Sequence, residues 1–300
     1  ALVYIAIKHR LPRDASTPLS ARLGLVAAGF MPFLLWELFA LFYYGFLFPN
    51  TYYAKLHAGL PQAWMFNQGV LYFINSISWD PITLIVIFTG ITLAFLQPDI
   101  KPRLIALGMT LYLFYILYIG GDFMTGRFFS AVCLAGVILL AHFFSQFTTQ
   151  QKYVLAGIIL FFGFLSPRGT IATFLNRNDK VMFDEYNGIS DERETYFAGT
   201  SLMSMNRAFD MPQDSFSTWG IKYRGAGKQV AVLGGIGIAG YFGGPDLKIV
   251  DIFALADPVL ARLPIKNPYT RIGHFERDLP KGYLETIESG ENKIANPKLA

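Results

Sequence analysis

An acidic and a basic residue lie in one short glycine-rich stretch between two apolar runs. The runs cover residues 104–118 and 128–144, and the stretch between them reads Ile119-Gly120-Gly121-Asp122-Phe123-Met124-Thr125-Gly126-Arg127-Phe128. Charged side chains are costly at membrane depth, so we expect Asp122 and Arg127 to serve a function. The glycines give a tight turn that brings backbone N–H groups close to whatever binds there. The structural alternative is a re-entrant turn in which the two side chains only pair with each other.

The composition is typical of a membrane protein. Of the 300 residues, 53% are hydrophobic and only 15% charged, and the mean hydropathy is +0.38. An ordinary soluble domain does not have that balance. The formal net charge is +4 without a Lys/Arg-rich tract, which argues against nucleic-acid binding. The single cysteine, Cys133, excludes an intrachain disulfide, and the sequence has no H-E-x-x-H, P-loop, zinc-spacing or G-x-S-x-G motif. We therefore expect neither metal nor cofactor.

Hydrophobicity divides the chain into two parts. Residues 1–166 are mostly apolar, whereas residues 167–300 carry the mixed charges of a soluble domain. The first part predicts a transmembrane domain with five complete spans, at residues 23–48, 82–96, 104–118, 128–144 and 153–166. Residues 64–78 are apolar but contain polar residues, which indicates an interfacial or re-entrant helix. Residues 2–7 have the character of the end of a span, so we expect a fragment that lacks upstream spans.

Basic residues predict how these spans are oriented. If successive spans cross the membrane in opposite directions, most basic residues of the loops lie on one side of it. These are Lys8, Arg10, Arg13, Arg22, Lys101, Arg103 and Lys152. The short loops of the opposite face hold only Lys55 and Arg127. The positive-inside rule makes the first face cytoplasmic. Residues 50–55, residues 122–127 and the C-terminal part therefore face outward, which favours an external active site.

The C-terminal part predicts a small α/β domain. Residues 229–233 and 247–251 have the pattern of buried strands, and Asp191-Glu192-Arg193-Glu194 can begin a helix. Between the strands, Gly235-Ile236-Gly237-Ile238-Ala239-Gly240 matches the dinucleotide motif G-x-G-x-x-G. The acidic residue that follows, Asp251, comes sooner than the usual spacing of about 20 residues. We therefore interpret the glycines as a strand-to-helix turn that needs close packing.

Several polar residues of this domain are candidates for binding. Asp251 ends a strand, where α/β sheets commonly place binding residues, and Asp257 follows in the next loop. His274 lies between Arg271 and Arg277, which suits contact with an anion or a sugar, and the alternative is a solvated charged face. The last residues, 289–300, show no apolar pattern and predict a disordered tail.

Separated stretches of the chain resemble one family of membrane enzymes. They are Pro49-Asn50-Thr51-Tyr52-Tyr53-Ala54-Lys55, Gly120-Gly121-Asp122-Phe123-Met124-Thr125-Gly126-Arg127-Phe128, Gly240-Tyr241-Phe242, Asp251, Leu255-Ala256-Asp257-Pro258, Ala261-Arg262-Leu263-Pro264, Arg271-Ile272-Gly273-His274 and Leu279-Pro280-Lys281-Gly282-Tyr283. In this order they resemble the polytopic arabinofuranosyltransferases of the actinobacterial cell wall, the terminal β-(1→2) enzymes, and their bacterial relatives. Some of these relatives carry a flagellar-motor-control label. The resemblance covers most of residues 40–285.

The resemblance implies a glycosyltransferase of the GT-C type in the bacterial inner membrane. Such an enzyme takes a sugar from a polyprenyl-phosphate donor, here decaprenyl-phosphoryl-arabinose, and passes it to a cell-envelope glycan outside the membrane. The catalytic carboxylate of GT-C enzymes commonly lies in the first external loop, which this chain does not contain. Within the chain, Asp122 is the best candidate for the base.

The resemblance also divides the outward-facing residues between donor and acceptor. Cations stabilise a departing phosphate, and aromatic and amide side chains bind sugar, so the predicted donor site comprises Arg127, Lys55, Asn50, Tyr52 and Tyr53. The predicted acceptor site comprises Asp251, Asp257, Arg271 and His274. The alternative function is a non-enzymatic membrane protein, a partner or regulator such as a motor-control factor. A transporter is a third possibility, but no internal repeat or pair of broken spans supports it.

Overall fold

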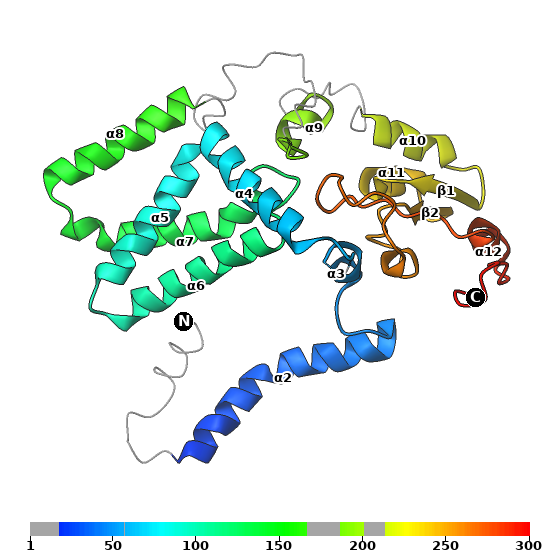
Figure 1. Ribbon diagram of the computed structural model, residues 1–300, viewed down its shortest axis with the longest axis horizontal. Coiled ribbons are helices and arrows are strands. Elements are labelled where there is room, and N and C mark those ends of the chain that lie inside the picture. Colours follow the sequence, from blue (N-terminus) through cyan, green and yellow to red (C-terminus); the bar gives the residue numbers. More distant parts are fainter. Residues whose placement is uncertain (1–17, 57, 167–186, 201–213) are drawn as a thin grey trace.

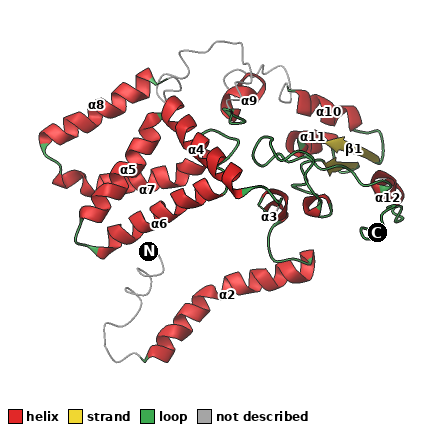
Figure 2. Ribbon diagram, in the orientation of Figure 1, coloured by secondary structure: helices red, strands yellow, loops and turns green. Residues whose placement is uncertain are grey.

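The computed structural model describes residues 18–56, 58–166, 187–200 and 214–300, and these are mostly helical (Figures 1 and 2). The N-terminal part contains α2 (Leu19–Tyr44), α3 (Asn50–Lys55), α4 (Gln62–Trp79), α5 (Pro81–Leu96), α6 (Ile100–Tyr118), η1 (Arg127–Phe129), α7 (Ser130–Phe143), η2 (Phe144–Gln146) and α8 (Thr149–Leu165). The C-terminal part contains α9 (Glu192–Thr200), α10 (Ser215–Tyr223), β1 (Gln229–Leu233), α11 (Ile236–Gly243), β2 (Leu247–Asp251), η3 (Leu260–Arg262) and α12 (Tyr283–Ser289). The predicted segment at residues 2–7 and the basic residues Lys8, Arg10 and Arg13 lie outside the described residues.

Among the described residues, three helical segments are long and apolar enough to cross a membrane, so the predicted number of five complete spans is not reached. They are Leu23–Tyr44, Ile100–Tyr118 and Arg127–Gln146. Helices α4 and α5 pass the same test only as a pair bent by 109°, as in a broken span or a re-entrant loop. The bend agrees with the prediction of a re-entrant or interfacial helix at residues 64–78. The predicted spans at residues 82–96 and 153–166 form α5 and α8, which are apolar but shorter than a typical span.

Local sequence explains where these helices begin and end. Pro81 occupies the first turn of α5, as predicted, and the Asp80 carboxylate accepts a hydrogen bond from Thr83 Oγ1 at 2.6 Å. A capping box formed by Thr148 and Gln151 begins α8. Helix α2 ends at Tyr44, before the predicted boundary at residue 48, because Gly45 adopts a left-handed conformation with φ of 78°.

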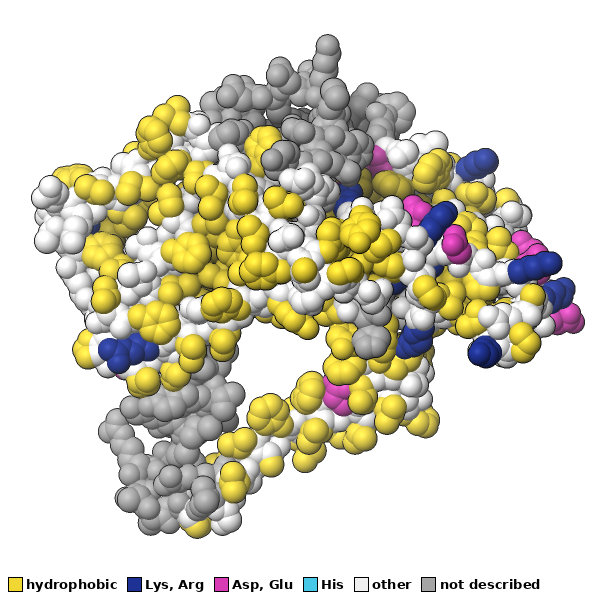
Figure 3. All heavy atoms as spheres, viewed as in Figure 1, with side chains coloured by type: hydrophobic (Ala, Val, Ile, Leu, Met, Phe, Trp, Pro, Cys, Tyr) yellow, Lys and Arg dark blue, Asp and Glu magenta, His cyan; other side chains and the backbone are white. Residues whose placement is uncertain are grey.

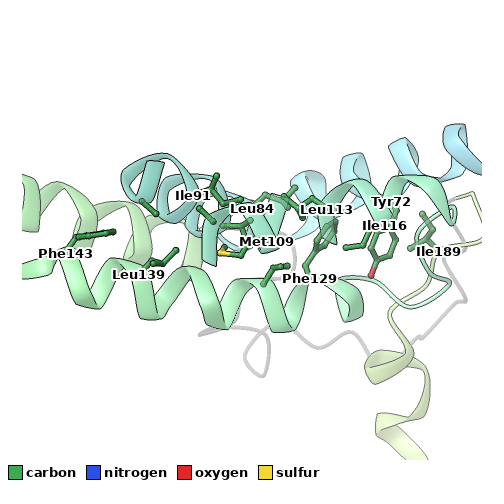
Figure 4. Packing of buried hydrophobic residues seen from close by; sticks show 14 residues of the cluster. Tyr72, Leu84, Ile91, Met109, Leu113, Ile116, Phe129, Leu139, Phe143 and Ile189 are labelled. Atoms are coloured by element: carbon green, nitrogen blue, oxygen red, sulfur yellow. The ribbon is translucent and has the colours of Figure 1, made fainter. Parts of the chain in front are cut away.

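The core of the helical part lies between α4, α5, α6 and α7 (Figure 4). Its fully buried side chains include Tyr72, Ile87, Ile116, Phe129 and Phe143. Small residues bring the backbones close together at two crossings. A Cβ atom on Gly90 of α5 would lie 3.0 Å from the Cα of Gly136 of α7, and one on Gly69 of α4 would lie 2.6 Å from the carbonyl oxygen of Leu117 of α6. Small residues at such contacts are typical of helices that pack within a membrane.

Helix α2 lies apart from this core (Figures 1 and 3). Its large apolar side chains are exposed, including Phe30, Phe33, Trp36 and Phe42, and Ala40 is its buried apolar residue. An apolar surface of this extent is normally covered by lipid or by another protein. Figure 3 also shows apolar side chains spread over the helices, with charged side chains gathered mainly over the C-terminal part.

The two predicted strands are confirmed residue for residue. β1 and β2 pair in parallel, with Gln229 opposite Leu247 and Leu233 opposite Asp251. Helix α11 connects them, and the predicted helix at Glu192 is α9. A Cβ atom on Gly235, the first glycine of the motif, would lie 2.4 Å from the ring of Phe216, whereas one on Gly237 would have nothing within 4 Å. The interpretation of G-x-G-x-x-G as a turn that needs close packing is therefore supported for Gly235 but not for Gly237.

The C-terminal tail departs from the prediction. The backbone N–H of Ala295 donates to the carbonyl of Lys281 at 3.0 Å, and that of Lys293 donates to Thr286 Oγ1 at 2.8 Å. Ile294 packs against the apolar cluster around Tyr283. The predicted disorder of residues 289–300 is wrong for this segment, because it gains contacts with α12 that its composition does not reveal.

Helix α3 joins the two parts of the chain. The guanidinium of Arg277 is buried and donates from Nη2 to the carbonyl of Ala54 at 2.7 Å. At the other end of α3, Asn50 Nδ2 donates to the carbonyl of Ala254 at 2.8 Å. The segment predicted as an external loop is thus a short helix between the helical part and the α/β part.

Candidate functional site

The glycine-rich stretch forms a tight turn between α6 and η1. Gly120, Gly121 and Gly126 have φ of 83°, 71° and 71°, a conformation that side chains with a Cβ atom rarely adopt. Tyr72 of α4 holds the turn, because its hydroxyl donates to the carbonyl of Met124 at 2.9 Å and accepts from the N–H of Phe128 at 3.1 Å. We call residues 119–128 the central turn.

Asp122 and Arg127 form a two-point ion pair across the central turn. Arg127 Nε lies 2.6 Å from Asp122 Oδ2, and Arg127 Nη2 donates to Asp122 Oδ1, also at 2.6 Å. The carboxylate side chain is 3% exposed, whereas the guanidinium side chain is 42% exposed. Burial raises the pKa of Asp122, and the charges of Arg127 and Lys55 oppose that shift. The pairing matches the structural alternative stated for this turn. Arg127 Nη1 donates to the Sδ of Met124 at 3.1 Å, so a ligand would have to replace that contact at the exposed side of the guanidinium.

Three cations surround the ring of Phe123. The guanidinium carbon of Arg271 lies 4.7 Å from the ring centroid, that of Arg127 lies 5.1 Å away, and Lys55 Nζ lies 5.8 Å away. All three distances are within the range of cation–π attraction. Burial lowers the pKa of Lys55, and the nearby Asp122 carboxylate opposes that effect. We call Lys55, Arg127 and Arg271 the cation cluster.

The cation cluster has two acidic partners among the described residues. Asp122 pairs with Arg127, and Glu192 pairs with Arg271, which also donates to the hydroxyl of Ser190. Arg127 is partly exposed, and an arginine in such a position binds phosphate oxygens with particular geometric fit.

A short segment before α9 fixes the central turn from the other side. The N–H of Ser190 donates to the carbonyl of Phe123 at 2.9 Å, and the N–H of Thr125 donates to the carbonyl of Ser190 at 3.0 Å. Gln68 of α4 donates to the carbonyl of Asn187 at 2.7 Å. The sequence analysis did not identify this segment, because nothing in its local pattern indicates a partner in the central turn.

His274 packs between two aromatic rings next to the cation cluster. Its ring lies 4.2 Å from that of Phe123 and 4.8 Å from that of Phe253, both in edge-to-face geometry. Burial lowers its pKa to about 4, and the positive charges of Arg271 and Lys55 add to that effect. His274 is therefore neutral at pH 7. Its Nδ1 atom is buried and has no hydrogen-bond partner among the described residues.

The predicted donor residues separate into two groups. Lys55 lies at the central turn, but Asn50 lies at the opposite end of α3, where its Oδ1 accepts from Arg262 Nη1 at 3.3 Å. The guanidinium of Arg262 stacks on the ring of Tyr53 at 4.1 Å, and Tyr52 packs against Phe48 with ring centroids 4.6 Å apart. The structure thus brings Lys55 and Arg127 together and places Asn50 and Tyr53 around Arg262.

The predicted acceptor residues separate as well. The Asp251 carboxylate accepts from the N–H groups of Phe253, Leu255 and Ala256 at 2.8–3.1 Å, and burial raises its pKa against the effect of these bonds. The Asp257 carboxylate accepts from the N–H groups of Val259 and Leu260 and from the Tyr283 hydroxyl at 2.7–3.0 Å. Both carboxylates therefore hold loops in place, while Arg271 and His274 remain next to open space.

Two cavities adjoin these residues. A cavity of about 40 Å³ lies beside Lys55 and Asp122, and it has room for about one water molecule but not for a sugar ring. A cleft of about 800 Å³ lies on the other side of Phe123, and Arg271 and His274 are part of its lining. A cleft of this size falls within the usual range for small-molecule sites, so the space for a large ligand is here.

No protein-family model, curated protein or solved structure matches this chain. Among the described residues, no group of three or more His, Cys, Asp or Glu side chains is arranged to hold a metal ion. The chemistry of the site is therefore interpreted from the cation cluster, the buried carboxylate and the cleft.

Proposed function

We propose that this chain forms part of a membrane glycosyltransferase that moves a sugar from a polyprenyl-phosphate donor to a cell-envelope glycan. By resemblance the sugar is arabinofuranose, and the reaction takes place on the outer face of the bacterial inner membrane. The observation that supports the proposal most strongly is the cation cluster around Phe123, next to the buried Asp122.

The position of the cation cluster suits a lipid phosphate. The central turn connects two segments that are long and apolar enough to cross a membrane, Ile100–Tyr118 and Arg127–Gln146. A polyprenyl chain lies in the bilayer, so its phosphate lies at the level where such segments end. The exposed side of Arg127 can bind two phosphate oxygens, and Lys55 and Arg271 add positive charge. These cations would stabilise the phosphate as it departs from the sugar.

The ion pair suggests how the carboxylate is made available. When Arg127 turns toward the donor phosphate, Asp122 loses its closest counter-charge and becomes a stronger base. The acceptor hydroxyl then attacks the anomeric carbon, and its proton passes to the carboxylate. The bond from the anomeric carbon to the phosphate oxygen breaks, and polyprenyl phosphate leaves with the electron pair. If the GT-C base lies upstream, as the resemblance implies, Asp122 instead holds Arg127 and Lys55 in position.

Transfer of a labelled sugar tests the proposal. The protein is assayed in membranes with labelled polyprenyl-phosphoryl pentose and a glycan acceptor. Arg127→Gln should lower transfer about 100-fold or more, as loss of an electrostatic contact to the leaving group does. Arg262→Gln is the matched control, because it removes the same charge at the far end of α3. Equal activity of the two variants, or no transfer by the wild type from several lipid-linked sugars, would refute the proposal.

The role of Asp122 has its own readout. If Asp122 is the base, the Asp122→Asn variant should have a kcat that is about 10²- to 10⁴-fold lower, with little change in the KM for the donor. If Asp122 instead positions Arg127 and Lys55, the same substitution should mainly raise the KM for the donor, because these two cations lose their counter-charge. Unchanged kcat and KM would remove Asp122 from the reaction.

One observation favours a non-enzymatic membrane protein as the second candidate. Both carboxylate oxygens of Asp122 already contact Arg127, which is sufficient for a purely structural turn. In that case the exchanged pair Asp122→Arg with Arg127→Asp should fold and support the cellular phenotype. A transferase with the exchanged pair should fold but transfer no sugar.

A further inference from the structure

The cleft of about 800 Å³ lies at the carboxyl ends of the two parallel strands. Gly234 follows β1 and Phe253 follows β2, and both line the cleft. Parallel α/β sheets bind ligands at this edge, because the loops that leave the strands converge there. The cleft extends from this edge to Phe123 and Met124 of the central turn. It therefore ends beside the cation cluster.

Aromatic rings form two rows along the cleft. In the first row, the ring of Phe216 lies 6.5 Å from that of Tyr196 and 5.6 Å from that of Trp219. The second row is Phe253, His274 and Phe123, with successive rings 4.8 and 4.2 Å apart. Trp219 is 45% exposed and lines the cleft, so part of its side chain is accessible to a ligand. Flat apolar faces that alternate with polar groups suit a ligand with both apolar and hydroxyl-bearing surfaces.

The charged groups of the cleft are mainly acidic. Among the described residues, the lining includes the carboxylates of Glu192, Asp214 and Glu276. Arg271 is the one Lys or Arg in this described lining and is paired with Glu192, and His274 is neutral. The remaining carboxylates disfavour phosphorylated and uronic-acid ligands. Asp214 uses Oδ1 to accept from the N–H groups at the start of α10, at 2.7 and 3.0 Å. Its Oδ2 is buried and accepts from none of the described residues.

We infer that this cleft binds the acceptor as an uncharged oligosaccharide. Trp219 provides the stacking surface for the C–H face of a sugar ring, and Asp214 and Glu276 accept hydrogen bonds from sugar hydroxyls. The orientation of the oligosaccharide in the cleft rests on the proposed function. The end of the glycan nearest Phe123 would receive the sugar from the donor that the cation cluster holds. The inference adds residues of α10 that no sequence motif identified.

A basic peptide is the competing occupant, because carboxylates would attract it too. The partly exposed Trp219 and the buried Oδ2 of Asp214 favour the oligosaccharide, since a sugar offers a flat C–H face beside hydroxyl donors. The binding experiment therefore includes both probes.

Binding without a donor tests the inference independently of transfer. The full-length protein in nanodiscs is titrated with a labelled neutral pentofuranose tetrasaccharide, with a labelled tetralysine peptide and with a tetragalacturonide. We expect the neutral tetrasaccharide to bind, and Trp219→Ala to weaken its binding at least 10-fold while Trp219→Phe retains much of it. Asp214→Asn should also weaken binding, and it keeps the helix cap because Asn is an equally good N-cap residue. Tyr241→Ala is the control, since Tyr241 is 80% exposed on α11 outside the cleft.

The outcomes separate the two proposals. If Trp219→Ala and Tyr241→Ala bind the tetrasaccharide equally, or if the peptide or the tetragalacturonide binds more tightly, the acceptor cleft is refuted. If transfer proceeds normally in a Trp219→Ala variant, the cleft assignment fails while the proposed function stands. If the tetrasaccharide binds in the cleft but the wild type transfers no sugar, the proposed function fails while the cleft stands.

Discussion

The ion pair of the central turn should respond unequally to the loss of either partner. The Asp122 side chain is 3% exposed and the Arg127 side chain is 42% exposed. Arg127→Gln leaves a buried carboxylate with only the more distant Lys55 as counter-charge. Asp122→Asn leaves a guanidinium that already reaches water. Loss of the cation should therefore destabilise the folded protein more than loss of the carboxylate.

Exposure sets the expected magnitudes. An uncompensated buried charge lowers the free energy of unfolding by about 3–5 kcal/mol. Because Lys55 still provides a nearby positive charge, we expect Arg127→Gln to lose about 3 kcal/mol, at the lower end of this range. Removal of the partner of an exposed cation costs about 1 kcal/mol. The double variant removes the buried charge as well, so we expect it to lose only about 2 kcal/mol. The double-mutant cycle then yields a coupling of about 2 kcal/mol.

These free energies are measured by chemical unfolding in detergent at pH 7, monitored by tryptophan fluorescence. The proteins compared are the wild type, Arg127→Gln, Asp122→Asn and the double variant. Arg262→Gln is the control for loss of an exposed arginine and should cost about 1 kcal/mol or less. A larger loss for Asp122→Asn than for Arg127→Gln would refute the argument. It would mean that the carboxylate is not the buried partner of the pair.

Two further predictions concern the same region. Gly121→Ala should cost about 3 kcal/mol and Gly126→Ala about 1 kcal/mol, because both have φ of 71° but only the first would place a Cβ atom 2.5 Å from the Tyr72 side chain. Equal losses in urea unfolding would show that this contact is unimportant. His274 has a pKa lowered to about 4, so the folded state binds fewer protons than the unfolded chain between pH 6.5 and 4. The free energy of unfolding should therefore fall by about 2 kcal/mol as the pH drops through this range, and less in His274→Gln. A wild-type profile that matches the variant would contradict the burial of this ring.

Local patterns predicted much of the fold. The strands at residues 229–233 and 247–251 are recognisable because each is a short run rich in apolar and β-branched residues, although the burial expected for them is only partial. The start of α5 follows from Pro81, whose ring fits only the first turn of a helix. The apolar length of residues 100–118 and 127–146 indicates helices that can cross a membrane. Each of these properties depends on residues within one turn or one strand of each other.

The sharp bend between α4 and α5 shows where local patterns become insufficient. Asp80 and Pro81 mark a helix start, but the angle of 109° depends on how each helix packs against α6 and α7. The same limit applies to the length of a span. Residues 153–166 are as apolar as a short span, and only their surroundings decide whether α8 crosses a membrane or lies against it.

By itself, the sequence determined the chemical groups of the site and the turn that carries two of them. Gly120, Gly121 and Gly126 permit the positive φ angles that the turn adopts. The apolar runs on both sides of the turn place Asp122 and Arg127 at a helix end. Only the tertiary structure decided which residues meet. Arg271 and Lys55 reach Phe123 from distant segments, and Asn50 turns instead to a carbonyl 204 residues away. A side chain's type states what it can bind, but packing over long sequence separations decides which partner lies within reach.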